Sequence, residues 1–421
     1  MEGEMKIFLA TLGSAGDVYP FIAIGESLIQ AGYDVYLCTN PFFEKTALER
    51  HLKFISVGTN ENYLAAVNSK RLWHPKYAYK EICHFMMQQQ QPLYDALNSV
   101  TDESSIILTS LWAFSAKMLS EKKGCCVIPV RVSPSTLMSA YETALHRYTA
   151  WLSHFPIRIR RIVLGLIERY IIDRELAPYI NQFRVSIGLP KIHKILTSWT
   201  HKTDSNVICL FPDWFAAPQP DWPRHIKQVG FPLFNLLAHQ ETDDLDCFFN
   251  ASNKTVIFMP SWALSANNSV VAELIVKVRK KGFQCLIIGN KNSLYDHDKG
   301  IRIENHINLE KYLHRCVAII HHGGIGTTAQ SFFAGIPQLI IPSAFDQFDN
   351  ARRISNLNCG LALSETDDAI LDEKLGRILF DRSIAQHCCY IKNQFQANQN
   401  VYEQIVAIVR AAQLNHNTPM V

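Results

Sequence analysis

The chain has 421 residues, of which 48% are apolar, and a formal net charge of +3. This length is enough for two domains with separate hydrophobic cores. The small net charge, without a dense tract of lysine and arginine, argues against nucleic-acid binding. The sequence has no charged-then-apolar leader and no apolar run of about 18 or more residues, so we expect a cytoplasmic protein that does not span a membrane.

Eleven cysteines could suggest disulfide bonds, but most of them lie within apolar segments, as Cys38, Cys209 and Cys316 do. The two adjacent cysteine pairs lack the spacing of a zinc site. We therefore predict reduced, structural thiols.

Apolar strands alternate with helical segments in the first part of the chain. Residues 6–11 predict a strand, residues 12–20 a loop, and residues 21–30 a helix that ends at Gly32. Further strands are predicted at 33–39, 106–109, 126–131, 207–211 and 226–229, with a helix near 113–122. This alternation predicts a parallel, doubly wound sheet, which binds its ligands at the carboxyl ends of the strands.

A long helical stretch interrupts this alternation between residues 139 and 195. Its segment 157–167 mixes arginines with large apolar residues. Two interpretations fit the segment: a packed helix with arginines on its solvated face, or a helix that contacts a membrane surface or a lipid acceptor.

Turn-forming and charged residues replace the apolar runs near residue 238, where we place a domain boundary. A second alternating series follows, and residues 383–413 form a tail with helical periodicity. Strands are predicted at 255–259, 284–288, 316–320 and 338–342, and helices at 270–281 and 329–334. We predict an α/β chain with two Rossmann-like, doubly wound domains.

The stretch from His321 to Thr328, HHGGIGTT, joins a buried strand to a helix through a glycine turn. Gly323, Gly324 and Gly326 let the backbone approach a bulky ligand closely, and the start of the following helix favours an anion. His322 and Thr327 can donate hydrogen bonds to a phosphate, whereas His321 lies nearer the strand and would support it. Asp346 and Gln347 follow the next strand, where a carboxylate and an amide can bind hydroxyl groups.

The runs HHGGIGTT, AGIPQ and DQFDNARR together resemble the donor-binding signature of glycosyltransferases that have the GT-B fold and use nucleotide sugars. The resemblance implies that His322, Gly324, Gly326 and Thr327 hold the pyrophosphate and that Asp346 and Gln347 bind the sugar. It implies an acceptor-binding domain at 1–238, a donor-binding domain at 239–385, and a tail at 386–421 that packs back towards the first domain.

Three further donor contacts follow from the resemblance. Ser261 matches the serine of a phosphate-binding Gly-Ser turn, but Pro260 replaces the glycine and removes a backbone donor. His306 is at the position where relatives place an aromatic residue that stacks on the base, and Ile307 is at the position of a backbone contact. Histidine can stack on a base, although a surface histidine fits the sequence equally well.

Asp17 is the candidate general base for the acceptor hydroxyl. It lies in the first strand-to-helix loop, in Gly-Asp-Val-Tyr-Pro, where many relatives have a catalytic histidine in Gly-His-x-x-Pro. The alternative is that Asp17 only caps the following helix, and the two roles are compatible.

Stretches such as Arg71–Trp73, Ser110–Ala113 and Gly230–Phe234 resemble the rhamnosyltransferase subunits of rhamnolipid biosynthesis. This resemblance implies an inverting transfer of L-rhamnose from dTDP-rhamnose to a hydrophobic, hydroxyacyl lipid. The alternatives are a UDP-glucose-dependent glucosyltransferase that acts on a sterol, polyketide or phenol, and an inactive binding or scaffold protein. Trp73 and Trp112 are candidates to line the acceptor pocket, although a core position fits either one.

We expect no metal and no cofactor beyond the nucleotide sugar, because the helix dipole, backbone N–H groups and His322 can stabilise the leaving group. The Asp-x-Asp triplets at 244–246 and 296–298 are interpreted as solvated loops. The expected partners are a nucleotide sugar and a hydrophobic acceptor, with contact at the inner membrane surface as an open option.

Overall fold

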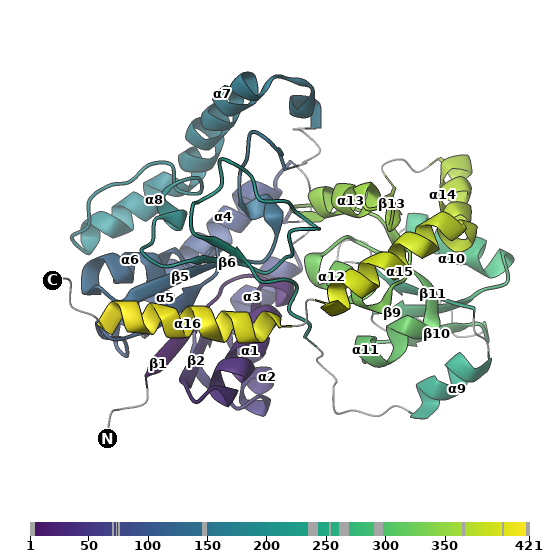
Figure 1. Cartoon of the computed structure of the whole chain (residues 1–421), viewed down its shortest axis with the longest axis horizontal. Helices are drawn as coiled ribbons and strands as arrows, with labels where there is room; N and C mark the ends of the chain where they lie inside the picture. The colour runs from purple at the N-terminus through teal and green to yellow at the C-terminus, as the bar shows by residue number, and fades with distance from the viewer. Residues whose placement is uncertain are drawn as a thin grey trace. The chain divides into compact units, whose positions relative to one another are not determined.

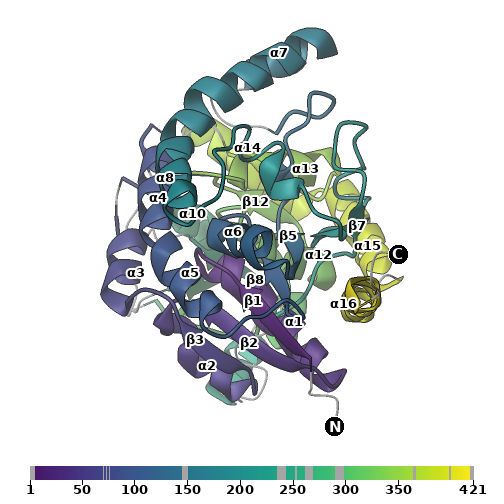
Figure 2. The same cartoon turned by 90° about the vertical axis from the view of Figure 1, so that its left-hand side faces the viewer.

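The computed structural model describes residues 5–69, 71–72, 74, 76–144, 150–234, 243–251, 254–260, 269–289, 298–363, 367–397 and 400–417. The chain divides into two compact units, one of residues 1–234 with 400–421 and one of residues 235–399. Each unit contains one parallel sheet with helices on both faces (Figures 1 and 2). This is the predicted pair of Rossmann-like, doubly wound domains. The predicted boundary after residue 238 lies outside the described residues.

The first unit has a seven-stranded sheet in the order β3-β2-β1-β4-β5-β6-β7. Its strands are β1 (Lys6–Ala10), β2 (Asp34–Thr39), β3 (Lys53–Ser56), β4 (Ile106–Thr109), β5 (Cys126–Arg131), β6 (Val207–Cys209) and β7 (Ile226–Gln228). Its helices are α1 (Ala15–Gln30), α2 (Glu44–Glu49), α3 (Asn60–Val67), α4 (Ala78–Gln88), α5 (Gln90–Asn98), α6 (Phe114–Lys123), α7 (Ile157–Ile167), α8 (Asp173–Ser186) and α16 (Val401–Asn417).

Alternate residues of the central strands enter two hydrophobic clusters, one on each face of this sheet. Ile7 and Leu9 pack with α1 and α16, whereas Phe8 and Ala10 pack with α5 and α6. The period of two in the strands therefore requires helices on both faces, as expected for a parallel sheet.

The start of α1 differs from the prediction. The helix begins at Ala15 instead of residue 21, and Pro20 lies inside it. A capping box between Ser14 and Asp17 starts the helix at Ala15. Pro20 lacks an N–H group, so the helix loses one backbone hydrogen bond there but continues through the residue.

The second unit has a six-stranded sheet in the order β10-β9-β8-β11-β12-β13. Its strands are β8 (Thr255–Met259), β9 (Gln284–Ile288), β10 (Ile301–Glu304), β11 (Cys316–His321), β12 (Gln338–Ile340) and β13 (Gly360–Ala362). Its helices are α9 (Asp243–Ala251), α10 (Ser269–Lys280), α11 (Leu309–Tyr312), α12 (Ile325–Ala334), α13 (Gln347–Asn356), α14 (Asp368–Phe380) and α15 (Arg382–Ala397). Every predicted strand of the two units agrees with the observed bounds within two residues, whereas β3, β10 and β13 were not predicted.

The residues of the predicted tail form two helices in different units. α15 belongs to the second unit and α16 to the first. The Tyr402 hydroxyl donates to the Leu233 carbonyl at 2.8 Å, and the Tyr33 hydroxyl donates to the Gln413 side chain at 3.2 Å. These contacts attach α16 to the first unit at both ends of the helix.

All eleven cysteines are free thiols, and most of them are buried. Within the part of the chain that the structure describes, no helix is long and apolar enough to cross a membrane.

Candidate functional site

The sheet of the second unit has a topological switch point between β8 and β11. From β8 the chain proceeds to β9 and β10 on one side, and then returns to β11 and β12 on the other side. The carboxyl ends of the two strands lie side by side, because Met259 pairs with His321. In open parallel sheets, ligands bind at this kind of crevice.

The glycine turn after β11 is a close-packed junction. Gly323 has φ of 90°, and a Cβ there would lie 2.7 Å from Ile340 Cγ2. Both the left-handed backbone and the lack of space require glycine. The carbonyl of Gly323 accepts a hydrogen bond from Asn350 Nδ2 at 2.9 Å, so the turn is also attached to α13.

His321 holds this turn from inside the sheet. Its Nδ1 accepts from the Gly323 N–H at 3.2 Å, so Nε2 carries the proton and donates to Gln338 Oε1 at 3.1 Å. The side chain is 1% exposed, and burial, with a smaller effect of His322, lowers its pKa to about 3. His321 therefore supports the turn as a neutral ring that accepts a hydrogen bond from the Gly323 N–H.

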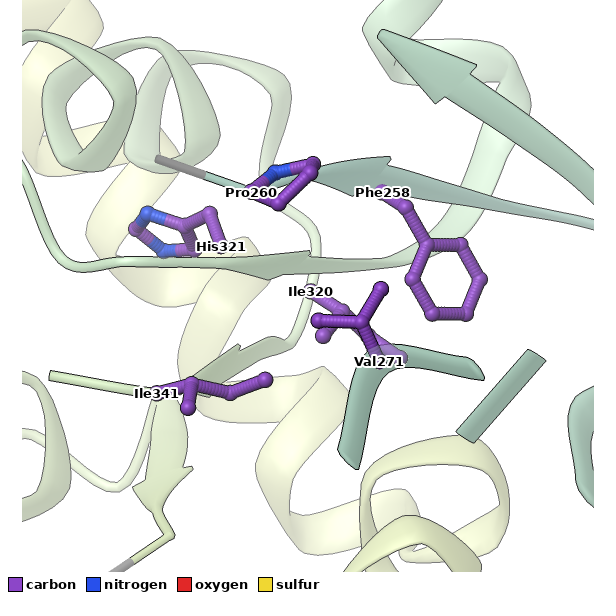
Figure 3. Close-up of a pocket in the computed structure, with 6 residues that line it drawn as sticks. All are labelled: Phe258, Pro260, Val271, Ile320, His321 and Ile341. Carbon is purple, nitrogen blue, oxygen red and sulfur yellow. The ribbon is translucent and has the colours of Figure 1, made fainter. Parts of the chain in front are cut away.

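A small apolar pocket lies beside His321, at the carboxyl ends of the same strands. Phe258, Pro260, Val271, Ile320 and Ile341 line the pocket with His321 (Figure 3). The low polarity of these neighbours is the reason that the ring of His321 stays neutral.

His322 is half-buried, and its ring lies over Gly324. An added Cβ on Gly324 would be 2.6 Å from His322 Nε2, so glycine is needed there to make room for the ring. His322 Nδ1 lies 3.4 Å from the Met259 carbonyl, which is the end of β8. Burial lowers the pKa of His322, and the contact with the Met259 carbonyl opposes this shift.

The start of α12 provides further donors at the same place. Gly324 is its N-cap, and Ile325, Gly326 and Thr327 form the first turn. The first N–H groups of a helix have no partner within the helix, and the dipole places positive charge there. Gly326 is exposed with open space around its Cα, so a ligand can approach the backbone. The arrangement suits an anion such as a phosphate.

Asp346 and Gln347 lie at the start of α13, which follows β12. Gln347 Oε1 accepts from the backbone N–H groups of Ser343 and Ala344 at 2.8 and 3.1 Å. The side-chain oxygen of Gln347 therefore stabilises the loop at Ser343 and Ala344, and the amide Nε2 is the group suited to a ligand. Asp346 Oδ2 accepts from Asn350 Nδ2 at 2.8 Å.

Asn350 joins the two parts of this site, since its side chain contacts both Gly323 and Asp346. The sequence analysis did not select Asn350, although its position four residues after Asp346 puts both on one helix face. Phe345, directly before Asp346, has φ of 53°. Non-glycine residues rarely adopt this conformation, and strained residues of this kind are enriched at functional sites.

The other predicted donor contacts are less well defined. Ser261 lies outside the described residues, and Pro260 ends β8 in the pocket of Figure 3. His306 is exposed and Ile307 half-buried in the loop after β10, which is two strands away from β8.

The first unit has a second switch point, between β1 and β4. Asp17 lies in the first turn of α1, directly after β1, and its Oδ2 accepts from the Ser14 N–H at 2.9 Å and from the Ser14 hydroxyl at 3.1 Å. The Leu12 N–H donates to Ser110 Oγ at 3.2 Å, so the loops after β1 and β4 are joined. Asp17 is half-buried at this junction.

Trp112 follows β4 at the same edge of the first sheet. It is half-buried and packs between the cluster on the α5 side and a second cluster that includes Phe114. Its carbonyl accepts from the buried side chain of Gln90 at 2.9 Å. Trp73 lies outside the described residues.

Among the described residues, no group of three or more His, Cys, Asp or Glu side chains could hold a metal ion. Asp246 pairs with Arg315 at 2.8 Å, and Asp298 pairs with Arg279 at 2.9 Å. Asp296 lies outside the described residues. Ion pairing thus accounts for Asp246 and Asp298, and the prediction of a loop at 244–246 is wrong, because these residues lie in helix α9.

Two glycine substitutions test whether the fold requires glycine at position 323 but not at position 326, where open space leaves the backbone accessible to a ligand. Gly323→Ala should destabilise the second unit by about 1–3 kcal/mol or more, because its backbone is left-handed and its Cβ has no space. Gly326→Ala is the matched control, and it should keep or slightly raise stability, because alanine favours the helix. The measurement is the urea midpoint of each variant, and equal midpoints would contradict the description of the turn.

Two family domains match the chain. Residues 7–142 match the glycosyltransferase family 28 N-terminal domain, and residues 262–410 match the C-terminal domain of the erythromycin biosynthesis protein CIII-like family. The sterol 3-beta-glucosyltransferase of Candida albicans is 23% identical over 98% of this chain. The chain spans only 26% to 33% of the length of three such sterol glucosyltransferases.

Two solved structures share the architecture. The glycotransferase of kitacinnamycin has a TM-score of 0.72 and 16% identity, covering 98% of this chain and 99% of that one. The spinosyn rhamnosyltransferase SpnG complexed with thymidine diphosphate has a TM-score of 0.64 and 18% identity, covering 97% and 99%. Such low identities show the fold alone. The domain matches and this fold together place the chain in the GT-B superfamily of glycosyltransferases, which includes family 28 and the EryCIII-like proteins.

Proposed function

We propose that the protein transfers a hexose from a nucleoside diphosphate sugar to a hydroxyl group of a hydrophobic acceptor. The main observation is the arrangement at the β8/β11 switch point: His322 and the first N–H groups of α12 can bind a diphosphate, beside Asp346 and Gln347. A diphosphate leaving group needs donors at the place where its charge develops. The carboxylate of Asp346 and the amide of Gln347 suit the hydroxyl groups of the sugar.

In the proposed reaction Asp17 removes the proton from the acceptor hydroxyl. The hydroxyl oxygen bonds to the anomeric carbon, the bond from that carbon to the diphosphate breaks, and the configuration inverts. Ser14 donates two hydrogen bonds to Asp17 Oδ2, and the proposed acceptor hydroxyl donates to the same carboxylate, which can accept several hydrogen bonds at once. Trp112, on the loop joined to that of Asp17, is the proposed apolar contact of the acceptor, together with Trp73.

Two pairs of sugar and acceptor have specific support. The sequence resemblance to rhamnosyltransferases of rhamnolipid biosynthesis supports L-rhamnose, dTDP and a hydroxyacyl lipid. The alignment of nearly the whole chain with a sterol glucosyltransferase supports transfer of glucose to a sterol, with UDP-glucose as the proposed donor. Both pairs use a hydrophobic acceptor, and the donor nucleotide distinguishes them.

The donor is identified by calorimetric titration of the purified protein with UDP, dTDP, UDP-glucose and dTDP-rhamnose. Tighter binding of the dTDP compounds would support rhamnosyl transfer, and tighter binding of the UDP compounds would support glucosyl transfer. Binding without transfer to any hydrophobic alcohol and without donor hydrolysis would favour the inactive binding protein. The replacement of glycine by Pro260 in the phosphate-binding turn supports that alternative.

Asp17→Asn tests the base. Asparagine at this third helical position can keep the hydrogen bond from the Ser14 N–H, so stability and donor affinity should stay near those of the wild type. The rate of transfer should fall by about 100-fold or more, because the amide cannot accept the proton. Ser14→Ala is the control that weakens the cap and leaves the carboxylate. A turnover within a few-fold of wild type for Asp17→Asn would remove Asp17 from this role.

Donor affinity should rise as the pH falls from about 8 to 5.5. In the neutral ring of His322, the proton on Nδ1 is donated to the Met259 carbonyl, so Nε2 has no proton. Nε2 can then donate to a phosphate only after the ring takes up a second proton and becomes charged. Burial lowers the pKa of the free site, and a bound diphosphate raises it, so binding takes up a proton. Titration with UDP-glucose or dTDP-rhamnose in buffers of different ionisation enthalpy measures this uptake, because these diphosphate diesters do not titrate in this range.

His322→Gln is the matched variant, since its amide donates without titrating. It should bind the donor with little dependence on pH. The same dependence on pH in this variant and in the wild type would contradict a titrating His322 at the phosphate.

A further inference from the structure

Helix α7 is an unusual element of the first unit, because none of its eleven residues is buried. Figures 1 and 2 both show it projecting away from the sheet of that unit. Seven of its residues, from Ile157 to Ile167, are isoleucine, leucine or valine. A helix of this composition normally buries one face, so its exposure calls for a partner.

Four exposed apolar residues of α7 and of the turn after it form a stripe, whereas the exposed Ile157 and Ile171 lie outside it. Ile159, Ile162, Leu166 and Tyr170 follow one another at spacings of three and four residues, which put them on one side of a helix. They are 42%, 64%, 49% and 58% exposed. We call these four residues the outer stripe.

Positive charge accompanies the outer stripe. Arg158, Arg161 and Arg169 are exposed in the same segment. The guanidinium of Arg169 lies 5.4 Å from the ring centroid of Tyr170, and that of Arg161 lies 6.0 Å from the ring centroid of Tyr141. Arg160 is different, because its Nε turns inward to donate to the Phe155 carbonyl at 2.7 Å. From Trp151 to Ile172 the sequence has one acidic residue, Glu168, and it is 2% exposed.

The carboxylate of Glu168 is turned inward. Its Oε1 accepts from the N–H groups of Leu196 and Thr197 at 3.1 and 3.2 Å. The surface around the outer stripe therefore presents arginines without exposed carboxylates from the same segment.

Aromatic side chains extend this surface at the start of α7. Trp151 is 51% exposed and packs edge-on against Phe155, which is 39% exposed, with ring centroids 5.5 Å apart. Tryptophan and tyrosine have an apolar body with a polar end, and they are enriched where a membrane meets water.

We propose that α7, with Trp151 and Tyr170 at its ends, binds the surface of an anionic lipid bilayer. The outer stripe enters the boundary between headgroups and acyl chains, and Arg158, Arg161 and Arg169 contact the lipid phosphates. The helix lies in the plane of the interface and does not cross the membrane. A second copy of this face would be a poor partner, because it would bring two sets of arginines together without carboxylates to neutralise them.

The test is co-sedimentation of the full chain with vesicles of phosphatidylcholine alone and of phosphatidylcholine with about 30% phosphatidylglycerol. We expect binding to the anionic vesicles that weakens as salt is raised. Each of Arg158→Gln and Arg161→Gln should lower the partition coefficient about fivefold. Ile162→Ser and Leu166→Ser should each lower it about tenfold or more.

Matched controls are Arg410→Gln on α16 and Val276→Ser on α10, which change the same types of residue at other exposed positions. Neither should alter vesicle binding. The proposal is wrong if the wild type does not sediment with anionic vesicles, or if the α7 variants and the controls bind equally. Concentration-dependent dimerisation that Ile162→Ser abolishes, without vesicle binding, would assign the face to a second copy instead. Vesicle binding needs no nucleotide sugar, so its failure would leave the proposed transfer reaction unaffected.

Discussion

The hydrogen bond from the Gly323 N–H to the neutral ring of His321 fixes the junction between β11 and α12. The chain must turn sharply there from a buried strand into a helix, and the positive φ of Gly323 achieves this only while its N–H has a partner. Gln338 orients the ring from the neighbouring strand β12. The direction of the α12 amides, and hence any anion site at them, depends on a histidine that does not titrate.

The same topological constraint acts in both units. In each sheet the chain first forms the strands on one side of a central strand and then forms the strands on its other side. The segments that follow the two central strands are therefore neighbours at the carboxyl edge of the sheet. In the first unit Ser110 and Asp17, in the first turn of α1, follow these strands, and in the second unit Pro260 and His322 do. The candidate catalytic and donor residues, far apart in sequence, thus occupy equivalent positions in two similar sheets.

Local patterns predicted those parts of the fold that are buried. The strands at 106–109 and 255–259 agree with the prediction at both ends, because they are apolar runs bounded by polar residues. β3 was missed because it is a half-exposed edge strand without such a run. The contact between His321 and Gln338 and the double role of Asn350 depend on pairing across strands and helices, which no local pattern contains.

The position of Asp17 constrains how the proposed transfer can proceed. Its carboxylate is part of the capping box of α1, so it is held in place by Ser14 and by the start of the helix. Aspartate is a weak base near neutral pH, and it accepts a proton readily only after the acceptor oxygen has begun to bond to the sugar. Departure of the diphosphate must then lead the reaction. Most of the stabilisation would come from His322 and the α12 amides, which connects the rate of transfer to the rigidity of the turn at Gly323.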